Sequence, residues 1–250
     1  MTDAMPSVYR RLRELTQARL ALGTSGSSLA TSEWLAFQYD WARARDAVYY
    51  ALDFDDLAAR IEGLGLETVR VASAAPSREV YLRRPDLGRQ LSDESAERLG
   101  QSAPTKPDVA VVVADGLSGW AVDQNAAPLI EALRERAGRG GWRLGSIVLV
   151  SQGRVAVGDP IGALLGARLT LLLIGERPGL SAADSLGAYL TYEPCSGRTD
   201  AERNCVSNIR EGGQPPASAA DTIGYIIDRA FAAGQTGVAL KDETALLQHE

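Results

Sequence analysis

Three loops combine glycine with a polar or charged side chain, each at the point where a short apolar run ends. They contain Asp115-Gly116, Gln152-Gly153-Arg154 and Gly175-Glu176-Arg177. If the apolar runs are parallel strands, these loops lie at the carboxyl edge of a sheet, where open α/β proteins bind ligands. A ligand can approach backbone N–H groups at glycine because no Cβ intervenes. Asp115 and Glu176 could also act as acid and base, although turn geometry explains any one loop equally well.

Several common chemistries are not expected. The single histidine, His249, stands one residue from the C-terminus, which argues against a Ser-His-Asp triad, a Cys-His dyad and a histidine-bound zinc. The chain has neither a Gly-x-Gly-x-x-Gly fingerprint after a strand nor a P-loop. Gly212-Gly213 precedes a predicted helix and could bind an anion, but a capping loop is the simpler interpretation.

The two cysteines are ambiguous. Cys195 and Cys205 are ten residues apart without a third or fourth ligand nearby, so a metal site is not expected. Cys205 lies in a polar segment that we predict to be a loop. It could face the same crevice as the three strand ends, or it could be an inert reduced thiol. Two cysteines are too few for a disulfide scaffold, which favours a reducing, cytoplasmic location.

The apolar runs predict an α/β fold with a mostly parallel sheet flanked by helices. Short segments at 109–114, 146–150 and 169–174, which are apolar apart from Ser146 and Thr170, fit strands that are covered on both faces. A helix with Leu129, Ile130, Leu133 and Ala137 inward and a shorter one at 161–165 separate them, which implies right-handed parallel crossovers. Further strands are predicted at 67–73, 79–82 and 186–192, and Pro215-Pro216 starts a last helix.

The front third reads as a helical appendage that packs on the main domain or on a partner. Helices are predicted at 7–22 and 32–52, and a short one starts at Asp55-Asp56. An apolar stripe in the second helix has helical spacing, and we expect it to pack in the core. The stripe consists of Trp34, Phe37, Trp41, Ala44, Val48 and Leu52.

Composition limits the class of protein. The chain has 250 residues, 45% of them hydrophobic and 23% charged, and a net charge of −6. This balance fits a globular protein with a sizeable core. The negative charge argues against binding to nucleic acid or to an anionic membrane surface. No apolar run reaches the about 18 residues of a membrane span, and the first residues lack the apolar core of a secretory signal.

An ordered set of motifs nevertheless resembles one family, over roughly residues 15 to 235. The motifs are Tyr81–Arg89, Asp115–Ser118, Gly153-Arg154-Val155, Ile174–Leu180, Asp184-Ser185-Leu186, Arg203–Ile209 and Gly212-Gly213. In this order they closely resemble the small (light) subunit of ethanolamine ammonia-lyase. The set as a whole is far more specific than any single glycine-rich loop.

The resemblance implies a Rossmann-like fold and a role in a hetero-oligomer. In this family the enzyme uses adenosylcobalamin to convert ethanolamine to acetaldehyde and ammonia, and the barrel-shaped large subunit carries the substrate site. The cofactor is held between the subunits. Matching motifs carry over Val155, Glu176 and Cys205 as cobalamin contacts, with no catalytic residue in this chain. Because the chain has no histidine motif for cobalt, the cofactor would keep its own dimethylbenzimidazole as lower ligand.

The resemblance also divides the chain. Residues 1–66 would be the helical region that docks on the large subunit, 67–240 the cobalamin-binding domain, and 241–250 a polar tail. Thr24 and Trp41 stand where the family usually has arginine and histidine, both in the docking region. Much of the N-terminal extension that some members use for microcompartment targeting is missing, which favours the free cytoplasm over a microcompartment. Two alternatives remain: a self-sufficient nucleotide-dependent α/β enzyme that uses Asp115 and Glu176, and a scaffold without cofactor.

Overall fold

The structure is a computed structural model that describes residues 7–16, 18–20, 22, 24–25, 27–101 and 106–240. The histidine at position 249 and the polar tail 241–250 lie outside the described residues. Within them, no helix has both the length and the apolar character that a membrane crossing requires.

One six-stranded sheet forms the centre of the molecule, with the strand order β3-β5-β4-β6-β7-β8. Its strands are β3 (Thr68–Ala72), β4 (Val109–Ala114), β5 (Ile147–Ser151), β6 (Leu169–Gly175), β7 (Leu186–Tyr192) and β8 (Asn204–Ile209). β3, β5, β4 and β6 pair in parallel, and β7 pairs antiparallel with both β6 and β8. The prediction of a mostly parallel α/β sheet is therefore confirmed.

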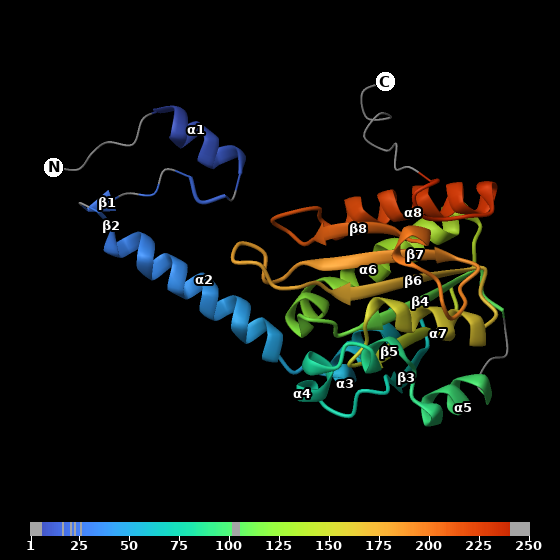
Figure 1. Ribbon diagram of the computed structural model, residues 1–250. Coiled ribbons are helices and arrows are strands. Elements are labelled where there is room, and N and C mark those ends of the chain that lie inside the picture. Colours follow the sequence, from blue (N-terminus) through green and yellow to red (C-terminus); the bar gives the residue numbers. More distant parts are fainter. Residues whose placement is uncertain are drawn as a thin grey trace, which may run out of the picture.

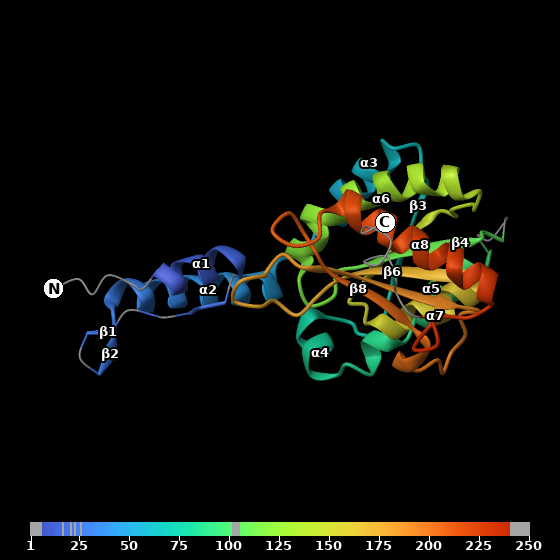
Figure 2. The same ribbon diagram turned by 90° about the horizontal axis from the view of Figure 1, so that it is seen from above.

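Helices cover the two faces of the sheet unequally (Figure 2). On one face lie α3 (Phe54–Glu62), α6 (Gly119–Gly140) and α8 (Pro216–Ala233), and on the other lie α4 (Arg78–Arg83), α5 (Asp93–Gln101) and α7 (Gly158–Leu164). The first face carries the larger core, in which α6 and α8 pack on each other and on the sheet. The second core is centred on β4, β5, β6 and α7. On that second face, Tyr189 of β7 is half-buried and Cys205 and Ser207 of β8 are exposed.

Local sequence explains the helix starts. Ser118 caps α6 by accepting a hydrogen bond from the backbone N–H of Ala121. Pro216 stands in the first turn of α8, where its missing N–H costs nothing. Short 3₁₀ turns complete the connections: η1 (Leu87–Arg89), η2 (Val155–Val157) and η3 (Asp200–Glu202).

Two predictions about local structure are wrong. Residues 79–82 were expected in a strand because Val80 and Tyr81 favour strands, but they lie in α4, which Ser77 caps at the Val80 N–H. Cys205 was expected in a loop, yet it lies in β8. The sequence of this strand is mostly polar and does not resemble that of a buried strand. β8 is at the edge of the sheet, and only its Val206 and Ile209 are buried.

The N-terminal arm projects from the body of the molecule (Figure 1). It consists of α1 (Ser7–Leu15), the two-stranded β1 (Thr24–Ser25) and β2 (Ser28–Leu29), and α2 (Thr31–Tyr49). The expected core packing of the aromatic stripe is wrong, because Trp34 and Trp41 are 48% and 53% exposed. Ala47 is the buried residue of α2. By contrast, α3 packs on the large core through Leu57 and Ile61.

Candidate functional site

The loops that follow β5, β4 and β6 are neighbours, because these strands are adjacent in the sheet. Asp115 joins two of them: its Oδ1 accepts hydrogen bonds from the backbone N–H of Gly116 at 3.0 Å and of Gly153 at 3.3 Å. The N–H of Leu117 donates to the carbonyl of Gly175 at 2.9 Å and so adds the third loop. The expectation that the three strand ends meet is confirmed.

Asp115 is buried within this junction and is only 6% exposed. Burial raises the pKa of its carboxyl to about 6, although Arg78 and backbone N–H groups act in the opposite direction. The Arg78 Nη1 lies 3.7 Å from the Asp115 Oδ2. Gly116 has φ +60°, and a Cβ there would lie 2.3 Å from the Gly175 carbonyl oxygen, so only glycine fits this turn.

A cavity of 440 Å³ opens above the junction. Val155, at the start of η2, and Glu176, directly after β6, both line it, together with Ile174 and the rings of Tyr81 and Tyr189. Asp115 is not part of its lining. The structure therefore brings Val155 and Glu176 together, and it separates Asp115 from Glu176 as a potential acid–base pair.

The carboxylate of Glu176 is held by two hydrogen bonds to its Oε2. It accepts a hydrogen bond from Ser185 Oγ at 2.5 Å and one from the backbone N–H of Asn208 at 3.2 Å. Asn208 has φ +58°, a conformation that costs energy in a non-glycine residue. Gly187 lies under the carboxylate, and a Cβ there would be 3.0 Å from Oε1. These contacts fix one position for the Glu176 side chain.

Cys205 of β8 is paired with Tyr189 on the neighbouring strand β7, and Tyr189 lines the cavity. Burial, the neighbouring thiol and the carboxylate of Glu176 raise the pKa of the Tyr189 hydroxyl. Partial burial also raises the pKa of the Cys205 thiol, so both groups are neutral at pH 7. The third predicted contact thus lies beside the cavity rather than in its lining.

Sequence reasoning did not assign a role to Tyr81. This fully buried ring lies between two guanidinium groups, with Arg154 Cζ 4.2 Å and Arg78 Cζ 4.9 Å from its centre. Its hydroxyl donates to the Gly153 carbonyl at 3.1 Å, and burial raises its pKa to about 12. Tyr81 therefore lines the base of the cavity and fixes the position of Arg154. The sequence feature that could have indicated this role is its position at the start of the Tyr81–Arg89 motif.

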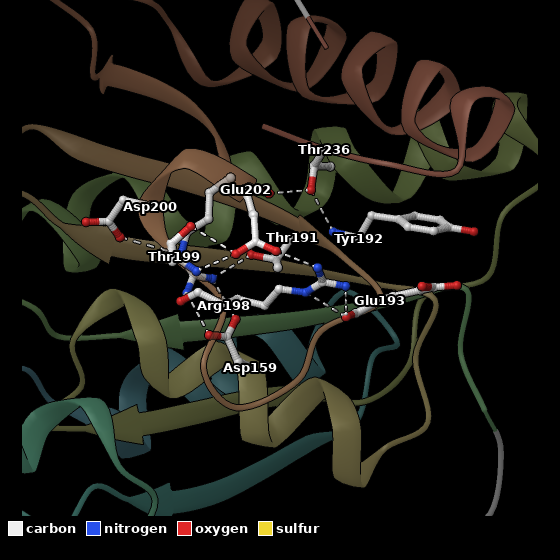
Figure 3. A network of polar contacts seen from close by, with 10 residues as sticks. Asp159, Thr191, Tyr192, Glu193, Arg198, Thr199, Asp200, Glu202 and Thr236 are labelled. Carbon is white, nitrogen blue, oxygen red and sulfur yellow. Dashed lines mark hydrogen bonds and ion pairs between the residues drawn. The ribbon is translucent and has the colours of Figure 1, made fainter. Parts of the chain in front are cut away.

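A second, larger cavity of 910 Å³ shares Arg154, Val155 and Tyr189 with the first. One of its walls is a polar network between α7 and the β7–β8 connection (Figure 3). There the buried Arg203 donates to both carboxylate oxygens of Asp159, each at 2.6 Å, and to Thr191 Oγ1 at 2.8 Å. Across the described part of the chain, no cluster of histidine, cysteine, aspartate and glutamate could bind a metal ion by itself.

Comparisons with known proteins agree over nearly the full length of the chain. A sequence model of the family described as ethanolamine ammonia-lyase light chain (EutC) matches residues 6–241. The chain is 51% identical over 238 residues to the ethanolamine ammonia-lyase small subunit of Xanthomonas campestris pv. campestris, covering 94% of this chain and 88% of that protein. It is 51% identical to the protein of the same description from Pseudomonas syringae pv. tomato (95% and 84% covered). It is 50% identical to the ethanolamine ammonia-lyase small subunit of a Pseudomonas putida strain, covering 97% of this chain and 90% of that protein.

Proposed function

Because the chain belongs to the ethanolamine ammonia-lyase light-chain family, we propose that it is the subunit that holds adenosylcobalamin against a large catalytic subunit. The reaction of the assembled enzyme would be the conversion of ethanolamine to acetaldehyde and ammonia. Val155, Glu176 and Cys205 would contact the cofactor. The observation that carries this proposal is the convergence of Val155 and Glu176 on one cavity beside Cys205.

The residues present fit a corrin. The ring has an apolar edge and a periphery of amide groups, which need hydrogen-bond acceptors. Val155, Ile174 and Tyr189 supply apolar surface, and the fixed carboxylate of Glu176 is an acceptor for an amide N–H. The neutral thiol of Cys205 suits a van der Waals or weak polar contact better than a bond to a metal. The smaller cavity alone is too small for the cofactor, but the larger one adjoins it.

In this proposal the chain does no bond-making itself. When bound, adenosylcobalamin supplies the radical chemistry of the reaction. The chain's own residues hold and orient the cofactor from one side, and its apolar wall excludes water from the shared site. The separation of Asp115 from the cavity disfavours the self-sufficient enzyme, because the carboxylate is bound by backbone N–H groups inside the loop junction.

The N-terminal arm supports assembly with a large subunit. Large exposed apolar patches on a protein surface commonly mark interaction sites, and α2 exposes Trp34, Leu35 and Trp41. Its C-terminal end is fixed next to the loop after β4 by Arg78, which binds the carbonyls of Val48 and Gly116. A partner on α2 would therefore face the edge of the sheet that carries the cavity.

Co-expression with a large subunit tests the proposal. We expect the two chains to elute together from size exclusion, with corrin absorbance in the same peak and ethanolamine turnover only in the complex. Glu176→Ala should weaken cobalamin retention without unfolding the chain. Glu131→Ala, on the exposed surface of α6, is the matched control. Turnover by the isolated chain, or a complex without bound corrin, would reject the role proposed here.

A further inference from the structure

The larger cavity has a charge pattern that the corrin contacts do not explain. Its lining includes Arg89, Arg154, Arg198 and Arg203, with Asp159 and Asp200 as the carboxylates. It adjoins the smaller cavity at Arg154, Val155 and Tyr189. A ligand seated on Val155 can therefore extend into it.

Two of the four arginines are already neutralised. Arg203 forms the buried bidentate pair with Asp159. Arg198 binds the Glu202 carboxylate at 2.6 Å and donates to the Glu193 carbonyl at 3.0 and 3.2 Å (Figure 3). Backbone and side-chain hydrogen bonds from Thr199, together with Arg198, lower the pKa of Glu202 to about 2, so this pair stays charged.

The other two arginines of the lining, Arg154 and Arg89, have no carboxylate partner among the described residues. The side chain of Arg154 is anchored by the Tyr81 ring, and its Nη2 makes one long hydrogen bond, 3.4 Å, to the Tyr81 carbonyl. Its Nε is buried and has no hydrogen-bond partner among the described residues. Gly88 makes room for its stem, since a Cβ there would lie 2.8 Å from Arg154 Cγ. The exposed Arg89 forms no side-chain hydrogen bond or ion pair with the described part of the chain.

We propose that Arg154 and Arg89 bind an anionic phosphodiester in the larger cavity, and that this group is the nucleotide tail of cobalamin. The inference rests on the proposed function. A guanidinium with spare N–H donors and a fixed orientation is well suited to a phosphate, because its fork matches two phosphate oxygens. The second carboxylate of the lining, Asp200, forms only a longer ion pair of 3.6 Å with Arg203 Nε, and its side chain is fully exposed.

The test compares a corrin that has the tail with one that lacks it. Adenosylcobalamin carries the phosphodiester and its base, and adenosylcobinamide carries neither. Binding to the complex with the large subunit is followed by corrin absorbance, for the wild type, Arg154→Met and Arg89→Gln. Methionine keeps an apolar stem over the Tyr81 ring. Arg83→Gln, in the same segment, exposed and outside both cavities, is the matched control.

We expect Arg154→Met to weaken the binding of adenosylcobalamin by about tenfold to a hundredfold, as for loss of a charge-assisted hydrogen bond. Arg89→Gln should have a smaller effect in the same direction. Binding of adenosylcobinamide should be unchanged in both variants, and Arg83→Gln should resemble the wild type. Thermal unfolding of each complex checks that the fold is intact.

Three results would overturn the inference. Equal losses for both corrins would mean that Arg154 acts on the corrin or on the fold instead of the tail. Unchanged affinity for both corrins would remove any role in binding. Calorimetric binding of inorganic phosphate that is lost in Arg154→Met, with corrin affinity unaffected, would assign the cavity to a separate anion. Failure of the wild-type complex to bind either corrin would instead reject the proposed function itself.

Discussion

Arg78 binds the carbonyl of Val48, the next-to-last residue of α2. Its Nε and Nη2 donate to this oxygen at 2.9 and 2.6 Å, and its Nη1 donates to the Gly116 carbonyl at 2.7 Å. The carbonyls at the end of a helix have no partner within the helix. One guanidinium therefore satisfies the end of the projecting arm and the loop after β4 at the same time.

Replacement of Arg78 should loosen this joint. Arg78→Met removes the donors to two carbonyls in a partly buried position, which should lower the free energy of unfolding by about 2 kcal/mol. Hydrogen exchange should become faster at the C-terminal end of α2 while the β4 and β6 amides remain protected. Arg83→Met is the control, because Arg83 is exposed on the same helix. Unchanged exchange in α2 would show that the arm is held by other contacts.

The buried Asp115 predicts an unusual pH dependence. Its pKa is raised from 3.8 to about 6 in the folded chain, so between these values the folded state holds a proton that the unfolded state has lost. This group's contribution to stability therefore falls as the pH rises from 4 to 6 and is constant above that range. The difference in pKa corresponds to about 3 kcal/mol.

Asp115→Asn isolates this contribution, since the amide oxygen can still accept from Gly116 and Gly153. Urea unfolding of the full chain at pH 4, 6 and 8 gives the difference between variant and wild type at each pH. We expect the variant to gain stability relative to the wild type by up to about 3 kcal/mol between pH 4 and pH 8. A difference that does not change with pH would contradict the raised pKa.

The buried ion pair of Arg203 and Asp159 links the β7–β8 connection to α7 across 44 positions of sequence. Arg203→Met should cost about 3 to 5 kcal/mol in the free energy of unfolding, because it leaves a carboxylate buried without its partner. The double variant Arg203→Met, Asp159→Leu should recover much of this loss, since no uncompensated charge remains. Denaturant titration measures both. If the single and double variants were equally unstable, the arginine would be acting through packing alone.

The strands of the sheet were predictable from the sequence where they are fully buried, because such strands consist almost entirely of apolar residues. β4 and β6 are buried along their whole length, and their sequences are apolar apart from Thr170. β8 is short and mostly polar, and only Val206 and Ile209 are buried, which makes it difficult to distinguish from a loop. In α4, the strand preference of Val80 and Tyr81 competes with the Ser77 cap, and the cap and tertiary packing prevail.

The site was predictable only in part, for a topological reason. Strand ends indicated Glu176 and the loop before Val155, because parallel strands place their carboxyl ends together. Tyr189 and Gly187 come from β7, which runs antiparallel to β6, and its direction cannot be read from its sequence. Pairing of Tyr189 with Cys205 follows from that direction. The aromatic stripe of α2 has helical spacing, but spacing does not tell whether its partner is this chain or another.

The exposed face of α2 predicts a selective loss of assembly. Trp34→Ser and Trp41→Ser should change the free energy of unfolding of the isolated chain by less than about 0.5 kcal/mol, because both rings are half exposed. Association with a large subunit should weaken by about 1 to 2 kcal/mol or more per residue, as for buried aromatic anchors of interfaces. Titration calorimetry measures the affinity, and Val238→Ser, at an exposed apolar residue outside the arm, is the control. Unaltered affinity in both variants would place docking elsewhere.

The contact between Gly187 and Glu176 permits a test that leaves the carboxylate itself in place. In Gly187→Ala the added methyl group would lie 3.0 to 3.2 Å from Oε1, Cγ and Cδ of Glu176, which is tighter than an ordinary contact. Because Ser185 and Asn208 both hold Oε2 of the carboxylate, the side chain must shift or the strand must yield by a few tenths of an ångström.

We therefore expect Gly187→Ala to reduce cobalamin retention by the complex in the same direction as Glu176→Ala, with a change in the free energy of unfolding of about 1 kcal/mol. Combining the two changes separates a direct effect from an indirect one. If alanine at 187 acts by moving Glu176, it adds little once the carboxylate has been removed, because the two losses share one contact. Full additivity of the losses in a double-mutant cycle of cobalamin dissociation constants would mean that Gly187 acts on the cofactor independently of Glu176.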